Sequence, residues 1–136
     1  PVSSYNDGKE VLVTSLHWMA SEQHGPLLMV TYMHHSVHLI ETKRWTRVRT
    51  IPLPGKIASA SLSNNGTFIA VSNLTKGFDV FRMETEEPVA SFEHDIGEPM
   101  PTPVLFTHEG RAIIGGTTVG KVNVWDIHSM KKINSL

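Results

Sequence analysis

The residues of this sequence that could carry out chemistry include a glycine-rich loop near the C-terminus. The run Gly115–Lys121 has the spacing of the first seven positions of a phosphate-binding loop, whose backbone N–H groups and lysine hold nucleotide phosphates. The next residue, Val122, cannot supply the hydroxyl that such a loop gives to magnesium, and an alternating strand pattern follows instead of a helix. We therefore interpret the glycines as a tight turn between two strands.

Five histidines in the first third of the chain are the second candidate: His17, His24, His34, His35 and His38. Imidazole binds zinc, but a catalytic zinc site needs three protein ligands and an open coordination position. Strand alternation separates His38 from His35, which points elsewhere or lies in a turn, and no carboxylate motif accompanies the group. We expect surface and turn histidines, with no metal and no cofactor.

No other motif indicates catalysis. The chain has no cysteine, which excludes thiol chemistry and disulfides. Serine, histidine and aspartate occur, but no nucleophile elbow or paired-carboxylate motif brings them together. We expect no catalytic residue and a protein that is not an enzyme.

A basic stretch around a tryptophan is the candidate for contact with an anionic partner. Cations beside an aromatic ring can hold RNA or phosphate. Alternation predicts that Arg47 and Arg49 share one strand face, with Trp45 in phase. The alternative interpretation is that the charges protect an exposed strand edge against aggregation. The candidate interaction residues are Lys43, Arg44, Trp45, Arg47 and Arg49.

Charge is nearly balanced over the whole chain but uneven along it. The net charge of −1 provides no overall field for nucleic acid or anionic lipid. Between Glu41 and Asp79 every charged residue is basic, whereas the following connection from Glu84 to Glu98 is rich in acidic residues. Successive segments therefore carry opposite charge on part of their surface.

Three copies of one strand pattern must position all of these residues. Each copy has a short apolar run, a turn, and an alternating strand that closes on Ile40, Phe81 or Trp125, so the spacings are 41 and 44 residues. A repeat of about 40–45 residues with four short strands is typical of a propeller blade. We place the repeats at about 9–53, 56–92 and 95–136 in a single domain, with 1–5 as an additional outer strand.

The repeats resemble those of the WD40 family of β-propellers over nearly the whole chain. Trp125-Asp126 matches the pair that gives the family its name, and His94 stands near the place of the family's Gly-His dipeptide. The resemblance implies structural roles for His94, Trp125 and Asp126 in the blade. The aspartate that the family places in the turn before the third strand is missing from all three copies, which implies stability that depends on packing.

The predicted fold is all-β, with three consecutive four-stranded antiparallel propeller blades of the WD40-like type. Closed propellers have 4–8 blades and each blade packs on two neighbours, so three blades make an incomplete ring with two open apolar faces. Both chain ends fall at the same phase of the repeat. We expect either a piece of a longer propeller or half of a ring that a second copy closes through a two-fold axis.

The function that the resemblance implies is a non-catalytic scaffold that binds a protein partner, with homodimerisation through the open faces as a further expectation. An RNA- or phosphate-binding module that uses Lys43–Arg49 is the alternative, with nucleic acid as the less favoured partner. No apolar run approaches the roughly 20 residues of a membrane span, and the first residues do not have the pattern of a signal peptide. We expect no membrane contact and an intracellular location, cytoplasmic or nuclear.

Alternation within the strands also predicts which side chains form the core. They are Leu16, Val30, Leu39, Leu62, Ile69, Val71, Phe78, Val80, Leu105, Ile113, Val122 and Val124.

Overall fold

The computed structural model describes residues 11–34, 36–93 and 98–136, which form three separate four-stranded antiparallel sheets. Each sheet consists of four strands that follow one another in the chain, and we call the sheets blades 1, 2 and 3. The predicted all-β blade fold is therefore confirmed. The outer strand expected at 1–5 and the residue His94 lie outside the described residues.

The strands have the following bounds. Blade 1 contains β1 (Val13–Ser21), β2 (Gly25–Tyr32), β3 (Ser36–Glu41) and β4 (Thr46–Ile51). Blade 2 contains β5 (Ile57–Leu62), β6 (Phe68–Asn73), β7 (Gly77–Arg82) and β8 (Pro88–Glu93). Blade 3 contains β9 (Val104–Thr107), the short 3-10 turn η1 (His108–Gly110), β10 (Ala112–Gly116), β11 (Val122–Asp126) and β12 (Lys131–Ser135).

The first hairpin has a short turn. β1 continues to Ser21 and β2 begins at Gly25, so the turn spans residues 22–24. Gly25 has φ = 70°, a left-handed conformation that glycine adopts without steric cost and that allows the chain to reverse quickly. The longer β1 places Met19 against the apolar cluster that joins blades 1 and 2.

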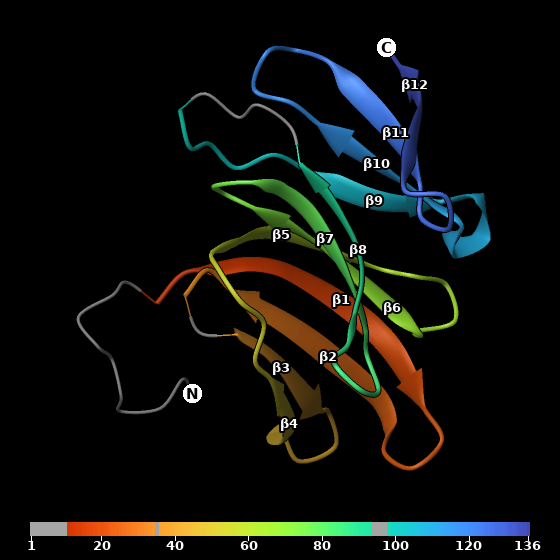
Figure 1. Ribbon diagram of the computed structural model, residues 1–136. Coiled ribbons are helices and arrows are strands. Elements are labelled where there is room, and N and C mark those ends of the chain that lie inside the picture. The colour runs from red at the N-terminus through yellow and green to blue at the C-terminus, as the bar shows by residue number, and fades with distance from the viewer. Residues whose placement is uncertain (1–10, 35, 94–97) are drawn as a thin grey trace.

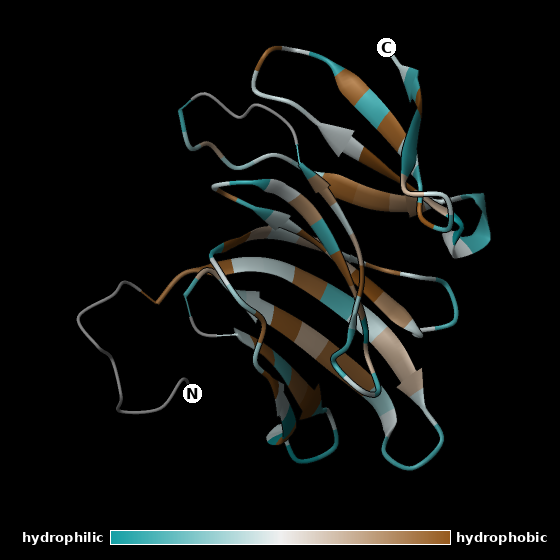
Figure 2. Ribbon diagram, in the orientation of Figure 1, coloured by the Kyte–Doolittle hydropathy of each residue, from teal (hydrophilic) through white to brown (hydrophobic). Residues whose placement is uncertain are grey.

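The three blades form an open row in which blade 2 is the middle member (Figure 1). The first strand of each blade lies beside the first strand of the next, because contacts join β1 to β5 and β5 to β9. Apolar residues are concentrated on the strands and polar residues on the hairpin turns (Figure 2). The described residues form no closed ring, so blades 1 and 3 each have one face without a neighbouring blade.

The core consists of two apolar layers, one on each side of blade 2. Successive side chains on a strand point to opposite faces, so Ile69 and Val71 pack toward blade 1 while Ala70 packs toward blade 3. The layer between blades 1 and 2 includes Met29, Val37, Leu39, Ile51, Ile57 and Phe81. The layer between blades 2 and 3 includes Phe78, Val80, Phe92, Val104, Ile113 and Trp125.

Nine of the twelve predicted core residues are buried or half-buried, and three are not. Leu16 is 58% exposed, Leu105 is 59% exposed and Val122 is 38% exposed, so their assignment to the core was wrong. All three lie on the outward faces of blades 1 and 3. Alternation identifies the apolar face of a strand, but it does not show whether another blade covers that face.

Candidate functional site

The strand register places corresponding residues of the three blades in equivalent rows. In blades 2 and 3 the first of these rows packs against the preceding blade. In blade 1 no described blade precedes it. Across the first three strands of each blade, this row is Trp18–Leu28–Ile40, Leu62–Ile69–Phe81 and Phe106–Ile113–Trp125.

The opposite sheet faces carry a second set of equivalent rows. In blades 1 and 2 this row faces the following blade, and in blade 3 it faces outward. The rows are His17–Met29–Leu39, Ser61–Ala70–Val80 and Leu105–Ile114–Val124.

Large apolar side chains therefore gather on two outward faces. We call the first of these surfaces the blade 1 open face and the second the blade 3 open face. The blade 1 open face consists of Leu16, Trp18, Leu28 and Ile40, of which Trp18 is 66% exposed. The blade 3 open face consists of Leu105, Ile114, Val122, Val124 and Leu136, of which Leu136 is 75% exposed and pairs with Val122 through two backbone hydrogen bonds of 2.8 and 3.0 Å.

Contiguous exposed apolar surface of this kind marks an interaction site or an aggregation hazard. The open faces follow from the predicted number of blades, but the sequence analysis did not identify Trp18 or Leu28 as functional residues. Alignment of the repeats on Ile40, Phe81 and Trp125 could have identified Leu28, because Ile69 and Ile113 lie at the same spacing and are buried. Trp18 lies farther from Ile40 than Leu62 and Phe106 lie from Phe81 and Trp125, so the strand register is needed to identify it.

A polar link joins the first strands at each covered blade interface. His17 Nε2 lies 2.7 Å from the carbonyl oxygen of Ala60, where the ring N–H can donate. At the equivalent position in blade 2, Ser61 Oγ accepts a hydrogen bond of 3.1 Å from the backbone N–H of Phe106. The third equivalent position holds Leu105, whose side chain has no hydrogen-bonding group. The blade 3 open face is therefore apolar where the covered faces are polar.

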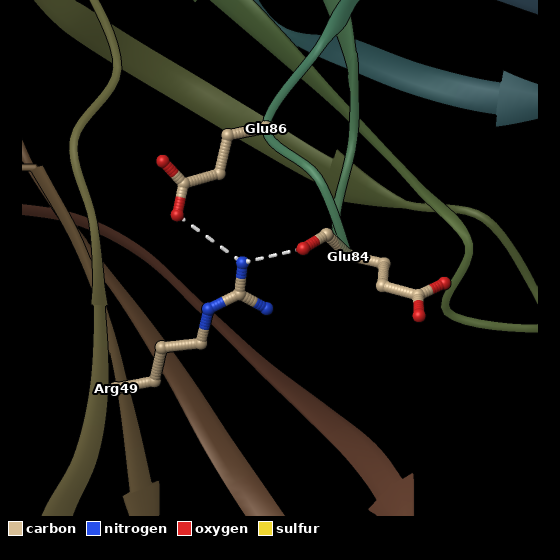
Figure 3. A network of polar contacts seen from close by, with 3 residues as sticks. All are labelled: Arg49, Glu84 and Glu86. Carbon is tan, nitrogen blue, oxygen red and sulfur yellow. Dashed lines mark hydrogen bonds and ion pairs between the residues drawn. The ribbon is translucent and has the colours of Figure 1, made fainter.

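The basic stretch does not form one surface, because Arg49 is directed toward blade 2. Its guanidinium forms an ion pair of 3.2 Å with Glu86 and donates a hydrogen bond of 3.1 Å to the carbonyl oxygen of Glu84 (Figure 3). This contact unites a basic strand of blade 1 with the acidic turn of blade 2. The uneven charge along the sequence therefore contributes to blade packing at this point.

A β-bulge explains why Arg47 and Arg49 do not act together. Arg49 pairs with Leu39 and Arg47 pairs with Ile40, so Val48 is an extra residue between them. Since Leu39 and Ile40 lie on opposite faces of β3, the two arginines also lie on opposite faces. The prediction that they share one strand face was wrong, because alternation assumes an unbroken register.

The rest of the basic stretch forms a turn around a carboxylate. Glu41 accepts hydrogen bonds from the backbone N–H of Lys43 at 3.0 Å and of Arg44 at 2.8 Å, and from the Thr46 hydroxyl at 3.1 Å. Burial raises the pKa of Glu41, but these hydrogen bonds and the charge of Arg44 outweigh it and hold the pKa below its usual value. A negative charge thus lies within the basic turn, while Trp45 is 66% exposed.

The Trp125-Asp126 pair has two separate roles in blade 3. The Trp125 side chain is 5% exposed and packs between Phe78 and Phe92, with ring centroids 5.2 and 5.6 Å away. Asp126 accepts a hydrogen bond of 2.6 Å from the backbone N–H of Ser129 in the turn between β11 and β12. Hydrogen bonds from the backbone and hydroxyl of Ser129 lower the pKa of Asp126, and His128 adds to the effect.

The histidines and the glycine-rich loop have structural positions. His38 is buried in β3 and packs on the Tyr32 ring at a centroid distance of 4.9 Å, and His17 of β1 lies at the interface of blades 1 and 2, so the expectation of surface and turn histidines was wrong for both. Within 11–34, 36–93 and 98–136, no three His, Cys, Asp or Glu residues are grouped so that they could hold a metal ion. Residues 117–121 form the predicted turn between β10 and β11, but Gly115 and Gly116 are the last residues of β10, so their assignment to the turn was wrong.

Sheets of four strands in a row, with their first strands adjacent, define the class of this protein as a β-propeller structure whose described blades leave the ring open. No protein-family model matches the chain, and no curated protein matches it. In the part of the chain that the structure describes, we find no helix long and apolar enough to cross a membrane.

Two solved structures are similar to this chain. Hydrazine synthase of Kuenenia stuttgartiensis has a TM-score of 0.66 and 17% sequence identity, and the match covers 97% of this chain and 39% of that chain. The structure of U3-55K has a TM-score of 0.70 and 14% identity, over 95% of this chain and 40% of that chain. This chain spans about two fifths of the length of the solved structures, and at these identities the likeness shows the fold.

Proposed function

We propose that this chain is a non-catalytic protein-binding scaffold of the WD40-repeat type, and that its binding surfaces are the two open faces. The proposal depends on one observation. The rows that pack between the blades elsewhere in the molecule carry exposed apolar side chains on blades 1 and 3, such as Trp18 and Leu105, beside half-buried ones such as Leu28 and Ile114. A protein partner would cover these rows as a neighbouring blade covers their counterparts.

The energy available from these faces is sufficient for specific binding. Full burial of one large apolar side chain contributes about 1.5–3 kcal/mol. Trp18 is the strongest candidate for a dominant contact, because tryptophan is enriched among residues that dominate binding energy. Its neighbours Leu16 and Leu28 would extend the contact along the blade 1 open face.

The roles of the polar residues support a scaffold rather than an enzyme. Glu41 and Asp126 organise hairpin turns, and Arg49 links two blades. The cysteine-free sequence fits a reducing compartment, so we also propose an intracellular location, cytoplasmic or nuclear.

Affinity purification of the full chain, with salt and nuclease treatment, tests the function. We expect a protein partner that stays bound at about 1 M salt, where the Debye length is only about 3 Å. Trp18→Gln should reduce its recovery at least about tenfold, because a dominant contact contributes about 2 kcal/mol or more. Val119→Gln is the matched control, since Val119 is 71% exposed in the β10–β11 turn, outside both open faces.

The RNA-binding alternative predicts a different result. Binding would be sensitive to nuclease, would fall steeply with salt, and would be lost in a Lys43→Glu/Arg44→Glu variant. The same variant should bind the protein partner normally under our proposal. Recovery of RNA by wild-type protein, with loss in the charge-reversed variant, would contradict the scaffold function.

A further inference from the structure

The two open faces are the two halves of one repeated interface. The blade 1 open face is equivalent to the faces of blades 2 and 3 that are covered by the preceding blade. The blade 3 open face is equivalent to the faces of blades 1 and 2 that are covered by the following blade. A second copy of this chain therefore offers each open face a surface with the matching strand register.

We infer that the partner of the open faces is a second copy of this chain. Blade 3 of each copy packs on blade 1 of the other, so that two chains close one six-bladed ring around a two-fold axis. Six blades lie within the range of 4–8 found in closed propellers, and two-fold assemblies are the commonest closed oligomers. The inference rests on the proposed function, because it names the protein that the open faces bind.

On both open faces, residues of the first strands β1 and β9 differ from their counterparts at the covered interfaces. At the covered interfaces, a polar side chain on one blade meets the backbone at Ala60 or Phe106 of the next. In the two-copy ring, Leu105 occupies the position of the polar side chain. Leu16 occupies the position equivalent to Ala60, and Trp18 occupies the position equivalent to Phe106. The position that loses the hydrogen bond on blade 3 is thus matched on blade 1 by Leu16, which is larger than Ala60, and by Trp18, which is large and apolar like Phe106.

The middle of the interface is also matched in volume. Phe78 of blade 2 packs directly over Gly115 of blade 3, which leaves no room for a larger residue there. The equivalent residues between blades 1 and 2 are Val37 and Val71, which belong to one apolar cluster. The equivalent positions on the two open faces are Val122, which is 38% exposed, and Val30, which is only 4% exposed in the single chain.

At this position, a large residue faces glycine between blades 2 and 3. Valine faces valine between blades 1 and 2, and the equivalent residues of the two copies are also valines. Val37 and Val71 fill this volume together between blades 1 and 2, whereas between the copies Val122 would gain the new contacts, because Val30 is already buried in its own chain. Because protein interiors are closely packed, such agreement in volume is needed for an interface to close without cavities or strain.

The outer rim shows the same correspondence. Arg49 of β4 reaches Glu86, which occupies the fourth position after the end of β7. The equivalent of Arg49 in blade 3 is Asn134, and the equivalent of Glu86 in blade 1 is Trp45. Trp45 and Glu86 both have positive φ, 57° and 64°, which supports the alignment of the two turns.

Blades 1 and 2 form an ion pair at this position. The interface between the copies would hold two uncharged residues there, so neither copy would bring a charge without a partner. Each side chain of the pair is 34% exposed, so replacing only one member would leave a partly exposed charge without its partner and would oppose association only slightly. Both members are replaced. The rim thus agrees with the first strands and the middle of the interface in favouring a second copy.

Sedimentation velocity on the full chain tests the inference, with two variants that disrupt opposite faces. We expect wild-type protein to have a mass of about 30 kDa, twice the 15.1 kDa of one chain. Trp18→Lys and Leu105→Glu should each be monomeric, because every interface of such a dimer would bury an unpaired charge. Val119→Lys, which changes an exposed residue outside both faces, should remain dimeric.

Mixing the two monomeric variants is the decisive step. A mixed dimer has one unchanged interface and one in which the introduced lysine faces the introduced glutamate, so dimer should reappear. Contact between two blade 1 faces, or between two blade 3 faces, would leave one of the single variants dimeric and would overturn the geometry. Circular dichroism of each variant must match wild type, since all the substituted residues are exposed.

A second measurement is independent of whether the charged variants fold. The sequence has no cysteine, so a Leu16→Cys/Leu105→Cys variant places the only thiols on the two open faces. Oxidation should yield a disulfide-linked dimer, whereas each single cysteine variant should remain unlinked. Absence of the linked dimer would contradict the contact between blades 3 and 1.

The outcomes for the inference and for the proposed function are distinct. A monomeric wild-type chain would overturn the second copy as occupant and would mean that another protein or further blades cover the faces. The scaffold function would then still be judged by the purification experiment. Nuclease-sensitive binding would overturn the scaffold function whatever the mass of the chain.

Discussion

At the scale of single residues, the same side chain takes opposite roles according to what faces it. Trp125 is buried between Phe78 and Phe92, whereas Trp18, which lies in the equivalent row of blade 1, is two-thirds exposed. Both belong to apolar strand faces, and only the position of the blade in the row separates them. Single residues therefore explain the close contacts inside an interface, but they do not show which surfaces become interfaces.

The contact between Gly115 and Phe78 gives the sharpest prediction at this scale. A Cβ at position 115 would overlap the Phe78 ring, so Gly115→Ala should lower the free energy of unfolding by about 1–3 kcal/mol. Urea denaturation measures the change. In a double-mutant cycle with Phe78→Leu, the two substitutions should cost less together than their sum, and strict additivity would show that the ring and residue 115 do not meet.

The ion pair of Arg49 should contribute little to stability. Its partner Glu86 and the arginine are each about one-third exposed, and solvent screens such pairs. Arg49→Met keeps the apolar part of the side chain and should lower the free energy of unfolding by no more than about 1 kcal/mol. The loss should shrink further at high salt. A loss of several kcal/mol in denaturant titrations would instead indicate a buried, unscreened pair.

At the scale of elements, a carboxylate organises the outer hairpin turn in two of the three blades. Glu41 ends β3 and Asp126 ends β11, and each accepts backbone hydrogen bonds from the turn that follows. The two residues occupy equivalent positions, since each lies one residue after the row that contains Ile40 or Trp125. The acidic residue of the Trp-Asp pair is thus explained by turn structure.

The turn at Asp126 predicts a pH-dependent effect. The folded-state pKa is lowered, so the carboxylate stabilises the fold above its unfolded pKa of about 4, and this contribution is lost as pH falls through the folded pKa. Asp126→Asn should therefore melt at a lower temperature than wild type at neutral pH. The difference should disappear in acid below the lowered pKa. Thermal denaturation from neutral to acidic pH checks this, and a gap that does not change with pH would contradict it.

At the scale of the whole molecule, three blades leave a matched pair of apolar faces. Each blade buries its faces only against neighbours, so the stability of the row is limited at its two ends. The similar solved structures are about two and a half times as long as this chain, which spans 39% and 40% of them. The open faces are the outward sides of the first and last described blades, and no single residue creates them.

Association through these faces predicts a melting temperature that depends on protein concentration. A dimer is stabilised by mass action, so the melting temperature should rise as the chain is concentrated. Trp18→Lys should remove this dependence while Val119→Lys should retain it. Scanning calorimetry at concentrations that differ about 100-fold measures the effect, and a wild-type melting temperature that stays constant would indicate a monomer or a dimer that does not dissociate.

Much of the fold could be predicted from the sequence. The spacing of Ile40, Phe81 and Trp125 and the alternation of the strands determine the three four-stranded blades, because the two-residue period of a strand is a local property. The sequence also predicts that an incomplete ring leaves apolar faces open. It does not predict the separation of Arg47 from Arg49, since a single bulge residue reverses the alternation.

Only the tertiary structure decided which apolar residues are interior and which are exposed. Leu16, Leu105 and Val122 have the same pattern as buried residues, and their exposure depends on a neighbouring blade that no local pattern encodes. The structure also decided the roles of the polar residues, because Arg49 and Glu86 are far apart in the chain and meet only when the blades pack. Local sequence determines the strands through backbone geometry, whereas burial and pairing depend on which blades lie side by side.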